Sequence, residues 1–488
     1  MRFKKLSGWI LMVVLLTAAL VLAGGGAALA NKHYVDDIND LHCDGDDNCE
    51  VPLSESKVAG GELKSGDTIV LDFSERELQT QSVIVDIENV TIRGAHGPSG
   101  TTVYAGKGFV DDDNTTMFEI RRGGVTLEGF RMTSYEDPQE GNENELESAV
   151  LVTAAGVGCL QNSGKNLTFE NLTVAESAYS DDKGGGGSNL INRAFHFKTC
   201  CNDYDNVTFL DVTIGELGTA DPENGNFVAG IHFEANDDDF PDDDDDYDDR
   251  YAYSVKNSTF ENVSIGDSTG VQGPGILFEN GGDLENIVVS DSVIGEDNSG
   301  HGIEVRSAED GDVGDIDGFK IVDSSIISNG GSGVWIGEYN EDDGNSVPIE
   351  DVDGLLIKDS ELNDHSSGYG LFIFADSVSN LEFNNAEAYN NDEDGVFVNT
   401  VGDIIDVRIL NESLFEGNGG HGVLLFPADD TSSSLLSSSD SEWGLEVRDS
   451  SFVNNEYCGL LVEATKHIRD VKVEGSMDNE DTAYKNGC

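Results

Sequence analysis

Residues 275–306 read GILFENGGDLENIVVSDSVIGEDNSGHGIEVR, and this stretch contains both patterns that decide the fold. The first pattern is a short alternating apolar segment that ends in Asp or Asn, as in Val288-Val-Ser-Asp291. The second is a glycine followed by apolar, any and apolar residues, as in Gly275-Ile-Leu-Phe278 and Gly302-Ile-Glu-Val305. Apolar residues that alternate with period two predict short strands with one buried face.

Both patterns recur along most of the chain. The first pattern occurs twelve times, 26 to 51 residues apart, with Gly in place of Asp or Asn in three copies. Its final positions are Gly94, Gly129, Asn171, Asp211, Asn262, Asp291, Asp323, Asp359, Asn385, Asn411, Asp449 and Gly475. Further copies of the second pattern begin at Gly230, Gly333, Gly370, Gly395, Gly422 and Gly459. Because one such repeat cannot bury its own apolar face, the repeats must stack on one another, which predicts a solenoid.

These repeats resemble those of right-handed parallel β-helix proteins of the pectate-lyase-like superfamily. The resemblance covers residues 67–488, and Gly66-Asp-Thr-Ile-Val-Leu71, Val90–Gly94 and Val125–Phe130 look like the first coils. It implies an all-β, single-stranded right-handed parallel β-helix of about 12 coils, about 55 Å long at the usual strand spacing. The superfamily includes lyases, hydrolases, epimerases, phage tailspikes and non-catalytic surface proteins, so the resemblance implies a fold more than an activity.

The N-terminus predicts export. Residues 1–30 have the form of a signal peptide: Arg2, Lys4 and Lys5, then the apolar run Trp9–Ala23, then small residues that predict cleavage near Ala30. An apolar run of about 15 residues is shorter than the roughly 20 of a membrane span, and an uncleaved anchor is the alternative. We expect a secreted or cell-surface monomer with no stable membrane span after cleavage, and an N-terminal cap formed by residues 31–66.

The charge of the chain is strongly negative. Asp and Glu number 95 against 27 Lys and Arg, giving −68, and removal of residues 1–30 takes three basic residues and no acidic ones, giving −71. Such a surface repels a phosphate backbone, so a nucleic-acid partner is excluded. Dense carboxylates suit concentrated salt, where screening removes their self-repulsion, and this predicts a halophilic protein. The alternative is that the acidity only keeps an exported protein dispersed.

Calcium is the one cofactor that the sequence suggests, at three places. The insertion 236–250 has ten aspartates between positions 237 and 249, although such runs are usually only solvated. The acidic residues between Asp44 and Glu55 have the spacing of a calcium loop, but Cys49 replaces the required glycine. Asp291, Asp323 and Asp359 occupy three successive repeats, where stacking would bring their carboxylates about 4.8 Å apart. That column predicts either a well-hydrated surface or bound cations.

Seven cysteines in an exported chain permit disulfides. Cys43 and Cys49 bracket a short acidic loop that they could close. Cys458 and Cys488 fall close together when the last repeats are aligned. A bond between them would close the open C-terminal edge of the solenoid, which would otherwise invite aggregation.

Alignment of the glycine-led strands predicts two outward-facing columns. The first contains Glu119, Leu151, His196, His232, Leu277, Glu304, Trp335, Phe372, Phe397, Leu424 and Leu461. The second, two residues further on, contains Arg121, Thr153, Lys198, Glu234, Glu279, Arg306, Gly337, Phe374, Asn399, Phe426 and Glu463. One half of this face is therefore ionisable and the other half is aromatic, which is unusual for an exposed surface.

These columns supply the candidate functional residues. The candidate catalytic residues are His196, Lys198, His232, Glu234, Glu279, Glu304 and Arg306, and the candidate sugar-stacking residues are Trp335, Phe372, Phe374 and Phe397. Together they predict binding of a polysaccharide or cell-envelope glycan. One alternative is a polysaccharide lyase or glycoside hydrolase that uses the ionisable half as its acid and base. Another is that loops cover the face and the aromatics form a second core.

Two histidine motifs add little to the case for catalysis. Gly300-His301-Gly302 and Gly420-His421-Gly422 resemble the Gly-His-Gly of polygalacturonases. The other motifs of that family are missing, and both histidines lie in a turn just before a repeat strand. We therefore expect a structural role for them.

Overall fold

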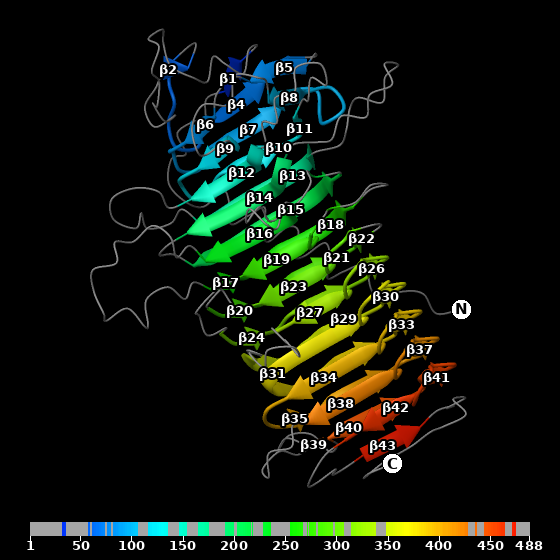
Figure 1. Cartoon of the computed structure of the whole chain (residues 1–488). Helices are drawn as coiled ribbons and strands as arrows, with labels where there is room; N and C mark the ends of the chain where they lie inside the picture. Colours follow the sequence, from blue (N-terminus) through cyan, green and yellow to red (C-terminus); the bar gives the residue numbers. More distant parts are fainter. Residues whose placement is uncertain are drawn as a thin grey trace, which may run out of the picture.

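The structure is a computed structural model of the whole chain. It describes residues 32–35, 57–58, 61–73, 76–79, 82–105, 116–134, 146–153, 164–174, 191–199, 203–215, 217, 228–235, 254–266, 271, 273–279, 282–295, 298–306, 314–337, 348–427, 435–436, 444–463 and 471–474. Within these ranges the chain forms strands and turns and no helix. Almost all strands pair in parallel with the strand one coil before and one coil after (Figure 1).

The glycine-led strands form the first of four stacks, here called stack 1. Figure 1 shows its members lying one below the next. In order they are β6 (Val83–Val85), β9 (Thr116–Ile120), β12 (Leu146–Thr153), β14 (Ile191–Thr199), β16 (Ala229–Ala235), β19 (Ile276–Glu279), β23 (Ile303–Arg306), β27 (Val334–Ile336), β31 (Leu371–Ser379), β34 (Val396–Thr400), β38 (Val423–Pro427) and β42 (Leu460–Val462).

The segments that end in Asp, Asn or Gly form stack 2. In order they are β1 (Lys32–Val35), β4 (Thr68–Leu71), β7 (Thr91–Gly94), β10 (Thr126–Glu128), β13 (Lys165–Val174), β15 (Tyr204–Ile214), β18 (Thr259–Ile265), β21 (Val288–Ser290), β25 (Lys320–Val322), β29 (Leu356–Lys358), β32 (Glu382–Asn384), β36 (Val407–Leu410), β40 (Leu445–Arg448) and β43 (Val471–Glu474). Residues 32–35, expected in a cap, therefore extend this stack.

Two narrower stacks complete the coils, and among the described residues stack 4 is present only from β15 to β39 (Leu435–Leu436). Stack 3 contains β5 (Arg76–Gln79), β8 (Thr102–Ala105), β11 (Arg131–Ser134), the last residues of β13, β15 and β18, then β22 (Val293–Gly295), β26 (Ser325–Ile327), β30 (Glu361–Asn363), β33 (Glu387–Tyr389), β37 (Leu414–Glu416) and β41 (Ser451–Val453). Stack 4 contains the first residues of β15, then β17 (Val255–Lys256), β20 (Leu284–Glu285), β24 (Ile316–Asp317), β28 (Ile349–Asp353), the end of β31, β35 (Ile404–Ile405) and β39 (Leu435–Leu436). Outside the stacks, β2 (Lys57–Val58) and β3 (Gly61–Glu62) form an antiparallel pair.

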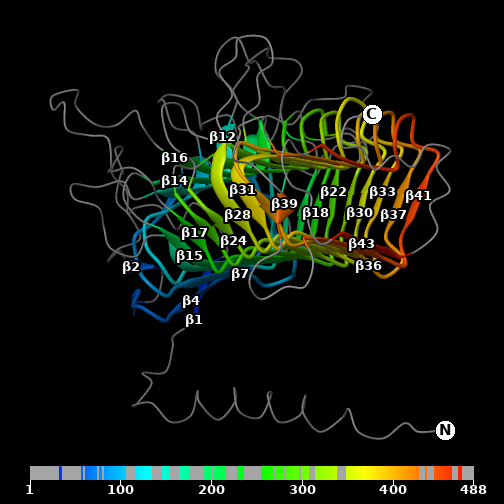
Figure 2. The ribbon, with the colours of Figure 1, turned by 90° about the horizontal axis from the view of Figure 1, so that it is seen from below.

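This arrangement is a parallel β-helix, which confirms the predicted fold class. Seen from below, the stacks form the walls of a long coil (Figure 2). Connections between parallel strands are right-handed in nearly all proteins, and we assign that hand here. The number of coils, about 12, stays a prediction.

Stacked aromatic rings fill the interior of the middle coils. Phe197, Phe233 and Phe278 come from stack 1, and their ring centroids are 4.3 and 5.1 Å apart. Phe169, Phe209 and Phe260 form a second column, inward from stack 2, at 4.9 and 5.1 Å. All six side chains are fully buried. Each ring adds stacking to the burial of its own area, so the columns fix the register of one coil upon the next.

A column of buried polar side chains, the asparagine ladder, follows the turn between stacks 3 and 1. Its members are Asn298, Asn329, His365, Asn391, Asn418 and Asn455. The amide nitrogen Nδ2 of Asn391 donates to Asn418 Oδ1 at 2.9 Å, and Asn418 Nδ2 donates to Asn455 Oδ1 at 2.8 Å. These bonds pair buried polar groups of successive turns, which would otherwise cost stability.

Candidate functional site

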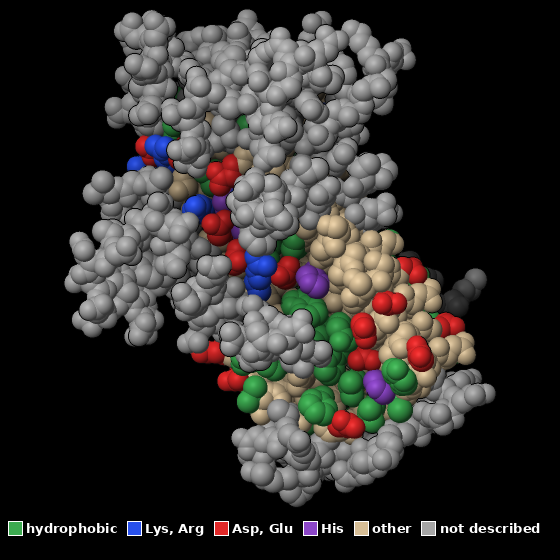
Figure 3. All heavy atoms as spheres, viewed as in Figure 1, with side chains coloured by type: hydrophobic (Ala, Val, Ile, Leu, Met, Phe, Trp, Pro, Cys, Tyr) green, Lys and Arg blue, Asp and Glu red, His purple; other side chains and the backbone are tan. Residues whose placement is uncertain are grey.

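The strand pairing of stack 1 confirms the register of the first predicted column, although His196, His232, Leu277 and Phe372 in it are buried. Each of its residues, from Glu119 to Leu461, is the register partner of the next. In the second column, the register from Thr153 to Arg306 and from Phe374 to Phe426 is confirmed. Figure 3 views this face: Lys and Arg lie over its upper part together with Asp, Glu and His, and hydrophobic side chains gather over its lower part, beside further Asp and Glu.

Two stacked histidines form the centre of the ionisable half. The rings of His196 (β14) and His232 (β16) are 5.3 Å apart and nearly parallel, and both are buried. His196 Nε2 lies 2.6 Å from Glu234 Oε2, and His232 Nδ1 lies 3.6 Å from the same oxygen. The opposite ring nitrogens face other carboxylates: His196 Nδ1 is 3.4 Å from Glu147 Oε1, and His232 Nε2 is 3.0 Å from Glu279 Oε2. We call these five residues the histidine–carboxylate cluster.

Arg193, on β14, adds a positive charge to this cluster. Its Nε donates to His232 Nδ1 at 3.1 Å, and its terminal nitrogens lie 3.7 and 3.8 Å from Glu147 and Glu234. Since His232 Nδ1 accepts this bond, its Nε2–H is the donor to Glu279, which describes a neutral imidazole. Burial lowers the pKa of His232 to about 4, although the hydrogen bond with Glu279 acts in the opposite direction. A lowered pKa agrees with a neutral ring.

The pKa values of the neighbouring carboxylates are shifted in different directions. Burial alone would raise the pKa of Glu234, but the hydrogen bond with His196 and the nearby positive charges lower it overall. Burial also raises the pKa of Glu279, but the hydrogen bond with His232 and the charge of Arg306 outweigh burial, so the pKa is lowered overall. At Glu304 burial dominates, and the pKa of its carboxyl is raised despite Arg306.

Arg306, on β23, joins the cluster to the next coil. Its guanidinium donates to Glu279 Oε1 at 2.8 Å and to Glu304 Oε1 at 3.3 Å. Lys198 is more peripheral, with Nζ 3.8 Å from Glu234 Oε1. The structure therefore brings all seven candidate catalytic residues together on four consecutive strands of stack 1.

The sequence analysis missed Arg193 and Glu147. Arg193 pairs with Ala229, the residue just before the glycine-led strand, so it belongs to a turn column that the alignment did not include. Later members of this column are His301, Ser332, Tyr369, Asp394, His421 and Cys458. The signal that could have found Arg193 is its position, one residue before the start of the repeat strand.

The turn column also explains the two Gly-His-Gly motifs. His301 Nδ1 accepts a hydrogen bond from the backbone N–H of Ser332 at 2.8 Å, and His421 Nδ1 accepts one from Cys458 N–H at 3.1 Å. Burial lowers the pKa of His301 to about 4, which keeps its ring neutral and able to accept. The structure therefore gives both histidines a structural contact to the next coil.

The aromatic half is packed more tightly than predicted. Trp335 and Phe372 stack with centroids 3.9 Å apart, and Tyr369 contacts both Phe372 and Phe397, at 5.3 and 5.6 Å. Phe372 is fully buried among the rings of Trp335, Tyr369 and Phe397, and Phe374 is 8% exposed. The prediction that all four rings face a ligand is therefore wrong for Phe372 and Phe374. Trp335 and Phe397 are half-buried and keep accessible surface.

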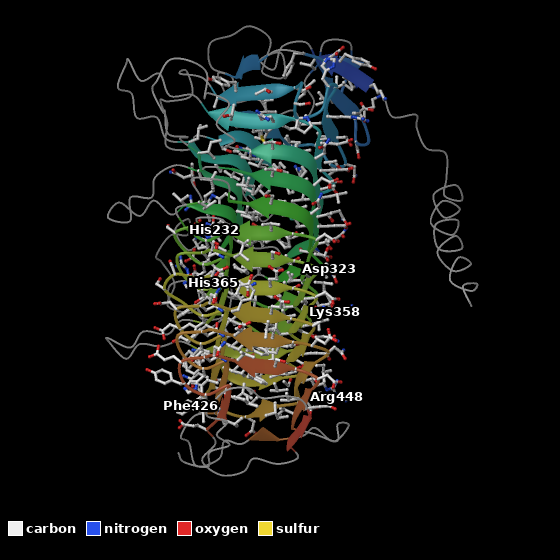
Figure 4. The ribbon with its side chains drawn as sticks, turned by 90° about the vertical axis from the view of Figure 1, so that its right-hand side faces the viewer. His232, Asp323, Lys358, His365, Phe426 and Arg448 are labelled. Atoms are coloured by element: carbon white, nitrogen blue, oxygen red, sulfur yellow. The ribbon has the colours of Figure 1, made fainter. Side chains whose placement is uncertain are left out.

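The three aspartates proposed as metal ligands form a column along the coils, but the backbone conformation there already explains why Asp occurs at these positions. Asp291 N–H donates to Val322 O and Asp323 N–H to Lys358 O, so Asp291, Asp323 and Asp359 occupy successive coils. All three have φ of 50°, in the left-handed region that Asn, Asp and Gly tolerate best. All three side chains are exposed, and Figure 4 shows Asp323 on the side of the coil opposite His232. Cation binding by this column stays a prediction.

We expect Asp323→Asn to fold with nearly unchanged stability, because Asn adopts a left-handed turn as readily as Asp. Asp323→Val should cost about 1–2 kcal/mol, since a branched side chain is strained there. Urea unfolding in the presence of Ca2+ and of a chelator measures both effects. If the column binds Ca2+, Asp323→Asn will instead lose a Ca2+-dependent part of its stability.

Several predictions concern residues outside the described ranges. They include the signal peptide, the acidic insertion 236–250, the loop from Asp44 to Glu55, and Cys43, Cys49 and Cys488. Cys458 is half-buried and has a free thiol, so its pairing with Cys488 is a prediction without support from the described residues.

In the part of the chain that the structure describes, there is no helix of the length and apolarity that a membrane crossing needs.

Comparisons with known proteins give structural likenesses only. No protein-family model matches the sequence, and no curated protein matches it. Among solved structures, the A-module of mannuronan C-5 epimerase AlgE4 from Azotobacter vinelandii is 12% identical, with 85% of this chain and 87% of that chain covered and a TM-score of 0.41. The Dettilon tailspike protein is 10% identical, with coverage of 84% and 62% and a TM-score of 0.36. The catalytic domain of a GH87 α-1,3-glucanase is 9% identical, with coverage of 86% and 64% and a TM-score of 0.35.

Proposed function

We propose that this protein binds a polysaccharide on the outer face of stack 1, between β16 and β34, and that it does so as an exported or cell-surface protein. The observation that carries the proposal is the junction at β23 and β27. Glu304 and Trp335 are register partners, so an Arg–Glu network directly adjoins a partly exposed indole. Sugar hydroxyls need charged or amide hydrogen-bonding partners, and the apolar face of a sugar ring packs on an aromatic ring.

The network supplies rigid hydrogen-bonding groups. Arg306 is held by both Glu279 and Glu304, so little side-chain entropy remains to be lost when a ligand binds. Phe372 supports the indole of Trp335 from the next coil, at 3.9 Å with an 11° tilt. Since coils repeat about every 4.8 Å, the face offers polar and aromatic groups along a line that an extended chain of sugars could follow.

Binding should be measured against soluble neutral and uronate polysaccharides, by calorimetry at high and low salt, with and without Ca2+. For a polysaccharide that the native chain binds, we expect Trp335→Ala to weaken affinity about tenfold, about 1.4 kcal/mol, because a stacking ring is lost. Trp335→Phe should retain part of the affinity. Arg306→Met keeps the apolar stem and should also weaken binding.

The matched control is Tyr457→Ala, which removes an aromatic ring that is 60% exposed on a turn near the C-terminal end. Its affinity should equal that of the native chain. The proposal fails if no polysaccharide binds, or if the Trp335 and Tyr457 variants lose affinity equally.

A second function, glycan cleavage by a hydrolase or lyase, is favoured by one observation. Glu304 is a buried carboxyl whose raised pKa favours the protonated form, and a protonated carboxyl beside a sugar is the usual proton donor of glycosidases. Under this alternative, Glu304→Gln should abolish turnover while leaving affinity within a few-fold. Binding without turnover by the native chain would support the first function alone.

A further inference from the structure

We propose that the histidine–carboxylate cluster binds one Zn2+ ion, with His196 Nε2, His232 Nδ1 and Glu234 Oε2 as its protein ligands. These three residues are a group whose donor atoms all lie within 4.8 Å of one another. Two imidazoles and one carboxylate form the ligand set of many zinc sites that keep a fourth position open. The proposal does not depend on glycan binding.

The distances fit an ion of this size. Zinc lies about 2.0–2.2 Å from nitrogen and oxygen ligands, so donors in a tetrahedral site are about 3.3 Å apart. His196 Nε2 and His232 Nδ1 lie 2.6 and 3.6 Å from Glu234 Oε2, on either side of that value. The two rings are nearly parallel, with centroids 5.3 Å apart, and an imidazole nitrogen binds a metal in the plane of its ring. One of the rings would therefore have to rotate out of the stack before all three donors, which lie within 4.8 Å of one another, could bind one ion.

The outer carboxylates are the second reason. In zinc sites, the ring nitrogen that does not bind the metal usually faces a carboxylate or carbonyl, which fixes the ring and raises its basicity. Here His232 Nε2 is 3.0 Å from Glu279 and His196 Nδ1 is 3.4 Å from Glu147. Each histidine thus has one nitrogen directed at Glu234 and the other at an outer carboxylate.

Arg193 is the competitor that the proposal has to accommodate. Its guanidinium lies between His232, Glu147 and Glu234, where its charge compensates the carboxylates. A zinc ion would take over this compensation, and Arg193 would have to withdraw from His232 Nδ1. The geometry therefore predicts that Zn2+ replaces the guanidinium of Arg193 beside His232 Nδ1. Removal of Arg193 should then strengthen zinc binding.

The test uses the full mature chain without a histidine tag, titrated with Zn2+ in excess Ca2+, which occupies weak all-oxygen sites. Calorimetry and displacement of a coloured zinc indicator should give one site per chain. Co2+ substitution should give the visible absorption of a tetrahedral complex. His196→Phe and His232→Phe keep a planar ring for stacking but have no nitrogen, and each should weaken the affinity at least tenfold.

Two further variants examine the surroundings of the site. Glu279→Gln should weaken zinc binding about tenfold, as loss of an outer partner does in other zinc sites, and Arg193→Met should strengthen it several-fold. His96→Ala, at an exposed histidine beside Asp72, is the matched control and should change nothing. Zinc binding that survives in both Phe variants, or that is equally lost in His96→Ala, would overturn the proposal.

Discussion

Replacement of Asn418 by Ala should destabilise the chain by about 3–5 kcal/mol. Asn418 Nδ2 donates to Ala388 O at 3.0 Å and to Asn455 Oδ1 at 2.8 Å. Its Oδ1 accepts from the backbone N–H and the Nδ2 of Asn391, at 3.2 and 2.9 Å. The residue is 1% exposed, so water cannot replace it, and each buried group left without a partner costs about 1–3 kcal/mol.

Urea unfolding followed by circular dichroism measures this loss, and amide hydrogen exchange should locate it to the coils around β37. The matched control is Asn384→Ala, on the outer face of stack 2, whose side chain hydrogen-bonds Glu382 and Asn411 within reach of water. It should cost less than about 1 kcal/mol. Equal effects at the two positions would contradict a special role for the asparagine ladder.

Asn418→Asp separates the donor from the acceptor role. The carboxylate could still accept from Asn391, but it could not donate to Ala388 O or Asn455 Oδ1. It would also bring a buried charge beside two acceptors. We expect a loss of stability at pH 8 at least as large as for Asn418→Ala, with partial recovery at low pH, where a protonated carboxyl regains one donor.

The parts of the fold that follow from alternation were predictable. Strands of period two, each introduced by a glycine, define their own register, because a slip of one residue would expose the whole buried face. This is why the alignment placed His196, His232 and Glu304 in one column that the strand pairing confirms. It is also why the column of Asp291, Asp323 and Asp359 was found, although its left-handed backbone was not.

Side chains in the turns were not predictable in the same way. Asn390 and Asn391 are adjacent and identical, yet Asn390 is an exposed residue with φ of 56° and Asn391 is buried in the ladder. Alternation cannot separate them, since their difference comes from the turn conformation. Arg193 was missed for a related reason: its function depends on contact with His232 on the next coil. Phe372 was misplaced because a repeat pattern predicts direction but not how fully neighbouring rings cover one another.

A single turn residue, Asp394, should contribute a loss of stability as the pH rises from about 4 to about 7. Asp394 is 7% exposed in the turn column, where its Oδ1 accepts a hydrogen bond from the backbone N–H of His421. Burial raises the pKa of its carboxyl from 3.8 to about 7, the hydrogen bond from His421 opposes this rise, and the charge of Glu393 adds to it. Tyr369 and His421 are the titratable members of the turn column on the coils before and after it.

The sign follows from proton binding. Between pH 4 and 7 the folded chain keeps a proton on Asp394 that the unfolded chain has released, so raising the pH favours unfolding. Below this window both states are protonated and nothing is lost. Above pH 7 Asp394 is ionised in both states, and the free energy of unfolding is lowered by the full amount, at most about 4 kcal/mol for a shift of about three pKa units.

Asp394→Asn mimics the protonated carboxyl and should therefore stabilise the chain at pH 8 by about 2–4 kcal/mol, with little effect at pH 4. Asp394→Ser is a second choice, because Ser332 in the same column accepts the corresponding bond from Tyr369 N–H at 3.0 Å. Urea unfolding of the variant and of the native chain at equal salt gives the difference as a function of pH, in which the charge of the remaining surface largely cancels. Glu393→Gln, at an exposed carboxylate in the same turn, is the control and should show a much smaller pH-dependent gain. A difference between Asp394→Asn and the native chain that stays constant from pH 4 to 8 would mean that Asp394 is ionised throughout, and that the coil accommodates its charge without cost.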